Sequence, residues 1–265
     1  YAVTAGVSVT AMFLGGWIPG IMLAVGLCVM NMFKCRKFDT PDRTPYPAKE
    51  YVVRFKDAFL ALLMPVIILG GIYTGVFTPT ESAAVACVYA LVVSVFVFRE
   101  VDAKKLYDIF AESCVSSAIV MFIISMSAPF SWFMTTENIP TILSTTIMAA
   151  FSSKYVILLM MNLLLLFLGC FLETQSIILL VTPILLPIAV ALGVDPIVLG
   201  LIIIVNTSIG MITPPMAVNI FVASSITKAS IGAISKRVMP YLILEFAILL
   251  FYMYVQVVFD ISFAP

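Results

Sequence analysis

The chain has 265 residues, of which 63% are hydrophobic and only 11% are charged. A soluble domain does not need so much apolar sequence, so the composition excludes an ordinary soluble protein and predicts a membrane protein. The 14 Lys and Arg residues balance the 14 Asp and Glu residues, so net charge indicates no particular partner, and no nucleic acid is expected to bind.

Uncharged runs of about the length of a membrane helix follow one another along the whole chain. A spanning helix needs about 20 apolar residues, and the bilayer core offers no water to satisfy backbone groups, so these runs are expected to be helices. They cover residues 10–33, 58–77, 82–98, 113–134, 155–172, 176–194, 196–227 and 238–259. The sequence therefore predicts an all-α polytopic membrane protein.

The beginning of the sequence predicts that the chain is part of a longer protein. It opens at Tyr1 with apolar sequence, without a start Met, a basic segment or a signal-peptide cleavage site. The five cysteines are scattered and form no CxxC pair, so neither a disulfide framework nor a zinc site is expected.

Positive residues mark every second connection between the predicted spans. Seven lie between Lys34 and Lys56, three between Arg99 and Lys105, and three between Lys228 and Arg237, whereas the other connections contain only Lys154. The positive-inside rule places the basic connections in the cytoplasm.

Two of the basic connections contain apolar residues at helical spacing, which predicts amphipathic helices along the cytoplasmic membrane surface. A solvated loop is the alternative. The apolar positions are Tyr51, Val52, Phe55 and Phe59 in the first segment and Leu106, Ile109 and Phe110 in the second.

The third span begins with a capping box. Thr78 suits the N-cap, Pro79 the first helical position and Glu81 the third, where its carboxylate can accept from the N-cap backbone. We therefore interpret Glu81 as a helix cap rather than as a functional acid.

The membrane pattern breaks first at residues 169–176. Glu173 lies there without a basic neighbour, and a charge at membrane depth costs about 2.5–3.5 kcal/mol on insertion scales. Pro183 and Pro187 are expected to interrupt the returning arm. A re-entrant hairpin and two complete spans give the same topology, and the polar tip favours the hairpin.

The second break lies at residues 206–215. At 1.5 Å per residue, helices over 196–208 and 215–227 would each rise about 20 Å, too little to cross a core about 30 Å thick. Together they cross it, with the interruption near the middle. A discontinuous helix of this kind is typical of a secondary transporter's binding site, and a proline-kinked structural helix is the alternative.

Local capping chemistry predicts how the two half-helices begin and end. Asp195 and Pro196 start the first half, and Gly210 is expected to end it in a left-handed conformation. Thr213 and Pro214 are expected to start the second half. The carbonyl end of the first half suits a cation, and the N–H end of the second suits an anion.

Three segments resemble signatures of the large membrane subunit of tripartite ATP-independent periplasmic (TRAP) transporters, and the resemblance covers nearly the whole chain. They are Gly70-Gly71-Ile72-Tyr73-Thr74-Gly75-Val76-Phe77-Thr78-Pro79-Thr80-Glu81-Ser82-Ala83-Ala84-Val85, Thr182-Pro183-Ile184-Leu185-Leu186-Pro187 and Ile209-Gly210-Met211-Ile212-Thr213-Pro214-Pro215.

The resemblance implies the second inverted repeat of an elevator-type secondary transporter in the bacterial inner membrane. Each repeat of that family is a re-entrant hairpin followed by a broken helix, so the first repeat would lie upstream of Tyr1. The resemblance further implies sodium-driven import of organic acids such as sialic acid or C4-dicarboxylates. Its partners would be a periplasmic substrate-binding protein and a small four-helix membrane subunit of the DctQ type.

Carried over by motif, a sodium site is implied at Gly169, Gly210, Thr213 and Met216. Glycine and Met would supply backbone carbonyls, and Thr213 could add its hydroxyl. Weaker matches for the substrate are Thr174, Asn206 and Asn219. No cofactor is expected besides Na⁺ as the coupling ion.

The predicted organisation has four parts. Residues 1–112 would form scaffold helices with cytoplasmic arm helices, 113–153 a connecting span and periplasmic segment, 154–228 the hairpin with the broken helix, and 229–265 a final transmembrane helix.

Three other classes of membrane protein are the alternatives. The chain has no histidine and no nucleotide-binding loop, so an enzyme is not expected. An ion channel, or a sodium-coupled anion transporter that works without a binding protein, is the main alternative because such breaks also line filters. A purely structural scaffold is the third.

Overall fold

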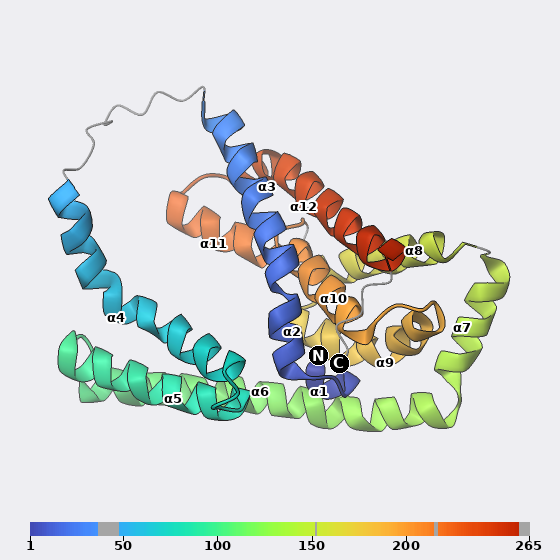
Figure 1. Cartoon of the computed structure of the whole chain (residues 1–265), viewed down its shortest axis with the longest axis horizontal. Coiled ribbons are helices and arrows are strands. Elements are labelled where there is room, and N and C mark those ends of the chain that lie inside the picture. The colour runs from blue at the N-terminus through green and yellow to red at the C-terminus, as the bar shows by residue number, and fades with distance from the viewer. Residues whose placement is uncertain (37–47, 152, 215–216, 260–265) are drawn as a thin grey trace. The chain divides into compact units, whose positions relative to one another are not determined.

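A computed structural model describes residues 1–36, 48–151, 153–214 and 217–259, and every regular element in them is helical (Figure 1). The chain forms two compact units, one of residues 1–35 with 120–265 and one of residues 36–119. The predicted four-part organisation is a different division and stays a prediction.

The larger unit contains α1 (Ala2–Ala5), α2 (Val9–Gly15), α3 (Trp17–Cys35), α7 (Ile139–Ala150), α8 (Lys154–Gly169), α9 (Thr174–Ala191), α10 (Pro196–Gly210), α11 (Val218–Thr227) and α12 (Ile231–Phe259). The smaller unit contains α4 (Ala48–Tyr73), α5 (Pro79–Val92) and the π-helix η1 (Val93–Val97). One long helix, α6 (Ala103–Thr136), belongs to both units.

The predicted helices are confirmed along the described chain. Five stretches there are long and apolar enough to cross a membrane, namely Val9–Cys35, Pro79–Val97, Ala103–Met134, Thr174–Ala191 and Ile231–Phe259. The remaining predicted runs correspond to the shorter apolar helices Ala58–Tyr73, Lys154–Gly169 and Pro196–Gly210. Helix α7 was not predicted, because its 12 residues are too short for the length criterion of a span.

In the smaller unit, α4 and α5 form a helical hairpin. The Ser82 hydroxyl donates to the Ile68 carbonyl at 2.9 Å, and the Tyr89 hydroxyl donates to the Leu60 carbonyl at 2.7 Å. Both bonds join α5 to α4, so the two helices are held together by polar contacts as well as by packing.

The capping box at the start of α5 is confirmed. The Glu81 backbone N–H donates to the Thr78 hydroxyl at 3.3 Å, and the Thr78 backbone N–H donates to the Glu81 carboxylate at 2.8 Å. Pro79 occupies the first turn, as predicted. Glu81 is therefore a helix cap.

The two basic amphipathic segments are helices rather than loops. The first lies in the N-terminal part of α4 and the second in that of α6, and each helix continues without interruption into the apolar sequence that follows. Tyr51 and Phe55 are exposed, as expected for residues that face lipid headgroups. Their location at the cytoplasmic surface stays a prediction.

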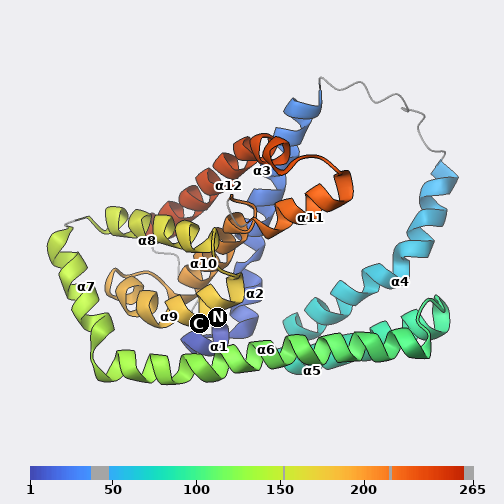
Figure 2. The same cartoon turned by 180° about the vertical axis from the view of Figure 1, so that it is seen from behind.

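Helix α10 forms the centre of the larger unit. Eleven of its 15 residues are buried, and it packs against α8, α9 and α12, as both views show (Figures 1 and 2). In a bilayer there is no hydrophobic driving force between helices, because the lipid tails are equally apolar. Helix association there depends on close approach of the helices. The predicted interruption of the returning arm at Pro183 and Pro187 is wrong, because α9 continues through both prolines.

Candidate functional site

The start of α10 follows the prediction, and its end does not. Asp195 is the N-cap, its carboxylate accepts from the Ile197 backbone N–H at 2.7 Å, and Pro196 occupies the first turn. Gly210 is the last helical residue and is not in the left-handed conformation, because the backbone stays right-handed through Met211 at φ −63°. The expected left-handed helix end at Gly210 is therefore wrong.

Gly210 is required instead by a contact with the tip of the hairpin. A Cβ atom added to Gly210 would lie 2.6 Å from both the Cα and the carbonyl carbon of Gly169. A Cβ added to Gly169 would lie 3.1 Å from the Gly210 Cα. The opposing atoms belong to the backbone and cannot rotate away, so the end of α8 and the end of α10 touch only because both residues are glycine.

Thr213 does not cap the second half-helix, because α11 begins at Val218 with Ala217 as its N-cap. The Thr213 hydroxyl donates to the Ile209 carbonyl at 2.8 Å, and the Thr213 backbone N–H donates to the Gly210 carbonyl at 2.9 Å. Thr213 therefore closes a turn on the end of α10. The predicted interruption is present between α10, which ends at Gly210, and α11, which begins at Val218.

The second arm of the hairpin also reaches the interruption. Thr174 begins α9, and its hydroxyl donates to the Met211 sulfur at 3.3 Å. On the far side of the interruption, the Asn219 backbone N–H donates to the Met211 carbonyl at 3.4 Å, and the Asn219 side chain is exposed.

The structure thus gathers most of the predicted site residues around one point. Gly169 and Thr174 come from the hairpin, Gly210 and Thr213 from the end of α10, and Asn219 from the start of α11. Met216 lies outside the described residues. The assignment of these residues to sodium or substrate stays a prediction.

Asn206 differs from the other predicted site residues because it is fully buried. Its side-chain N–H₂ donates to the backbone carbonyl and to the side-chain carbonyl of Asn162, both at 2.9 Å. Asn162 was missed in the sequence. The available signal is an amide in the middle of an apolar helix, where a polar group needs a partner.

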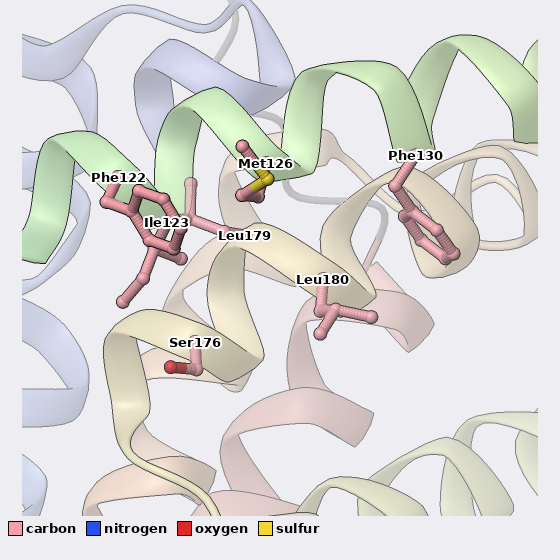
Figure 3. A pocket seen from close by; sticks show the side chains of 7 residues that line it. All are labelled: Phe122, Ile123, Met126, Phe130, Ser176, Leu179 and Leu180. Atoms are coloured by element: carbon pink, nitrogen blue, oxygen red, sulfur yellow. The ribbon is translucent and has the colours of Figure 1, made fainter.

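An apolar cavity of about 290 Å³ lies between α6 and α9 within the larger unit (Figure 3). Its lining residues are Phe122, Ile123, Met126, Phe130, Ser176, Leu179 and Leu180. Ser176 supplies the single hydroxyl among them, so the cavity has neither the charge nor the oxygen atoms that an anion or a sodium ion would need.

The polar groups around the interruption include the hydroxyls of Thr174 and Thr213 and the backbone carbonyls of Gly210 and Met211. No group of three or more His, Cys, Asp or Glu residues suited to a metal ion occurs in the part of the chain that the structure describes. Neutral oxygens at the end of a half-helix are the type of donor that binds sodium in secondary transporters.

A polytopic helical protein with a hairpin packed against an interrupted helix has the elements of a secondary transporter. The chain belongs to the family described as "Tripartite ATP-independent periplasmic transporter, DctM component", which matches residues 1–258. It is accordingly a multi-pass protein of the bacterial inner membrane.

Three relatives illustrate this similarity. The chain is 40% identical over 262 residues to the "Isethionate TRAP transporter permease protein DctMQ" of Oleidesulfovibrio alaskensis, covering 97% of the chain and 41% of the relative. It is 38% identical over 251 residues to the "C4-dicarboxylate TRAP transporter large permease protein DctM" of Rhodobacter capsulatus, covering 95% and 57%.

The third relative is the "Sialic acid TRAP transporter large permease protein SiaM" of Vibrio cholerae, which is 36% identical over 249 residues, covering 94% of the chain and 58% of the relative. The chain therefore spans between about two fifths and three fifths of the length of these three relatives.

Proposed function

We propose that the chain is the C-terminal half of the large permease subunit of a sodium-coupled importer of organic acids. The observation that carries the proposal is the backbone contact between Gly169 and Gly210, which brings the hairpin tip to the interruption after α10. Family membership supports the permease role.

The sodium ion would be bound at this contact. The carbonyls of Gly169 and Gly210 and the hydroxyl of Thr213 would be its oxygen ligands, with the Met216 carbonyl as a fourth. The Thr213 hydroxyl donates its proton to the Ile209 carbonyl, which leaves its lone pairs for a cation. The partial negative charge at the end of a helix such as α10 adds to the attraction.

The substrate would be a small organic anion bound beside the ion. The relatives are named for isethionate, C4-dicarboxylate and sialic acid, which are all anions. Thr174 lies in the first turn of α9, where the N-cap Glu173 makes no side-chain capping bond, and helix N-termini favour anions. Asn219, in the first turn of α11, would contact the same anion.

Transport would follow an elevator mechanism, in which the hairpin and the broken helix carry ion and substrate together across the membrane. The close packing of α8 and α9 on α10 supports motion as one body. The partners would be the N-terminal half of the same subunit, a small DctQ-type membrane subunit, a periplasmic substrate-binding protein and the surrounding lipids.

The proposal is tested by reconstituting the complete complex with its binding protein in proteoliposomes. We expect an inward sodium gradient to accumulate a labelled organic acid above its external concentration, and collapse of the gradient to abolish the accumulation. A channel would only dissipate gradients, and a sodium-coupled carrier of another class would accumulate substrate without the binding protein.

A further inference from the structure

A buried pair of amide side chains joins the first arm of the hairpin to the first half of the broken helix. Asn162 lies on α8 and Asn206 on α10, 44 positions apart in the chain. At most 1% of either residue is exposed. The Asn162 side-chain N–H₂ donates to the Leu158 carbonyl at 2.9 Å and contacts the Met253 sulfur at the same distance.

The orientation of the Asn206 amide is fixed by its partners. Its N–H₂ group faces two acceptors of Asn162, so rotating the amide would place its oxygen against two other oxygens. The Asn206 Oδ1 therefore faces away from Asn162, and it is buried without a hydrogen-bond partner among the described residues. An unpaired buried acceptor is destabilising because it has lost its hydrogen bonds to water.

That cost shows that the pair is a poor choice for packing alone. An apolar side chain of similar size would fill the same space without an unpaired oxygen, and interhelical hydrogen bonds in membranes contribute little net stability on average. The two directed bonds set the register of the helices, because they fix the position of α8 along α10.

The two asparagines lie too far from the Gly169–Gly210 contact to be ligands of an ion bound there. Asn162 precedes Gly169 by seven residues and Asn206 precedes Gly210 by four. At 1.5 Å per residue these separations are about 10 Å and about 6 Å along the helices, so the amides are too far away to bind an ion held at the tip.

We propose that the Asn162–Asn206 pair is a positioning element that sets the register of the hairpin against the broken helix and thereby the sodium affinity of the transporter. This inference rests on the proposed function. It makes the Asn206 side chain a support for the ion site instead of a substrate contact.

The two residues are expected to contribute unequally. An average interhelical hydrogen bond in a membrane corresponds to about a threefold change in an equilibrium, so the two bonds that Asn206→Ala removes correspond to about eight- to tenfold. We expect the sodium concentration for half-maximal uptake to rise about tenfold. Asn162→Ala leaves the Asn162 backbone carbonyl as an acceptor, so we expect a rise of about threefold. The double variant should resemble Asn206→Ala.

The experiment uses the complete complex and two titrations, one of sodium at saturating substrate and one of substrate at saturating sodium. Ser208→Ala is the matched control, because Ser208 is exposed on α10 and its hydroxyl donates to the Ile204 carbonyl of the same helix at 2.8 Å. Sodium-dependent thermal stabilisation of the purified complex gives a second readout of ion binding.

A selective rise in the sodium requirement, in the order Asn206→Ala above Asn162→Ala above Ser208→Ala, is the expected result. A change in the substrate requirement alone, or an unchanged sodium titration in both asparagine variants, overturns the inference. If Asn206→Ala does not assemble, Asn162→Ala decides between these outcomes. Absence of sodium dependence in the unmodified complex would instead refute the proposed function.

Discussion

Two helical hairpins in this chain, α4–α5 and α8–α9, differ in how their connections are hydrogen-bonded. In the α4–α5 hairpin, Gly75 adopts φ +71°, and the following capping box pairs Thr78 with Glu81. The carboxylate of Glu81 accepts hydrogen bonds from the backbone N–H and the hydroxyl of Thr78 at the start of α5. These bonds lie within the connection and the first turn of α5.

The α8–α9 hairpin leaves its connection incomplete. Glu173 is the N-cap of α9 but makes no side-chain capping bond, and it is exposed. The tip is held from outside, by the contact of Gly169 with Gly210 and of Thr174 with Met211. The tip of the first hairpin is therefore held by local bonds, whereas the tip of the second is held by contacts with the interruption after α10.

The largest expected effect distinguishes two glycines that look alike in the sequence. A Cβ on Gly210 would meet the Gly169 backbone at 2.6 Å, whereas a Cβ on Gly71 would meet only the Phe77 ring at 2.6 Å. Because a ring can rotate and a backbone cannot, Gly210→Ala should raise the half-maximal sodium concentration by about tenfold or more, or abolish uptake. Gly71→Ala should change it less than about twofold. Equal effects of the two substitutions in the uptake titration would show that the Gly169–Gly210 contact has no special role in sodium binding.

Removal of the Thr213 hydroxyl should have the next largest effect. Thr213→Ala deletes one proposed ion ligand and its bond to the Ile209 carbonyl, so we expect the half-maximal sodium concentration to rise about three- to tenfold. Thr213→Ser keeps the oxygen and should be close to the unmodified protein. A well-assembled Thr213→Ala complex with unchanged sodium dependence would remove this residue from the site.

The capping box should affect stability without affecting transport. Thr78→Ala removes the cap of α5, which typically costs about 0.5–2 kcal/mol. We expect a lower thermal unfolding temperature of the complex and an unchanged half-maximal sodium concentration. A shift in sodium dependence would contradict the interpretation of the first hairpin as purely structural.

Chemical labelling of the two hairpin connections should show the smallest of these effects. With the native cysteines replaced, a cysteine at Gln175 should change its labelling rate by a few fold when sodium or substrate is added. A cysteine at Val76 should label from outside at a constant rate, and one at Lys104 should not label from outside. A constant rate at Gln175 in all conditions would favour two complete spans over a re-entrant hairpin.

The sequence predicted those features that depend on neighbours in the chain. Uncharged runs of sufficient length predicted the helices, and the caps at Thr78 and Asp195 were predicted because a cap bonds within its own first turn. The short helix α7 is not predicted by this criterion because its 12 residues are too few for a membrane span.

The errors at the candidate site concern contacts that are distant in sequence. Local capping rules predict a left-handed helix end at Gly210, but the glycine is required by its contact with Gly169, 41 positions earlier. The same rules predict that Thr213 caps the helix that follows, whereas it bonds to the helix that precedes it. Asn162 was missed because its partner on α10 is identifiable only in three dimensions.

The glycine contact also has a genetic consequence. No residue is smaller than glycine, so a substitution at Gly210 cannot be offset by shrinking Gly169, and the reverse holds as well. A selection for revertants of a Gly210 variant should therefore recover true revertants, or second-site changes that move a whole helix, and no compensating replacement at Gly169.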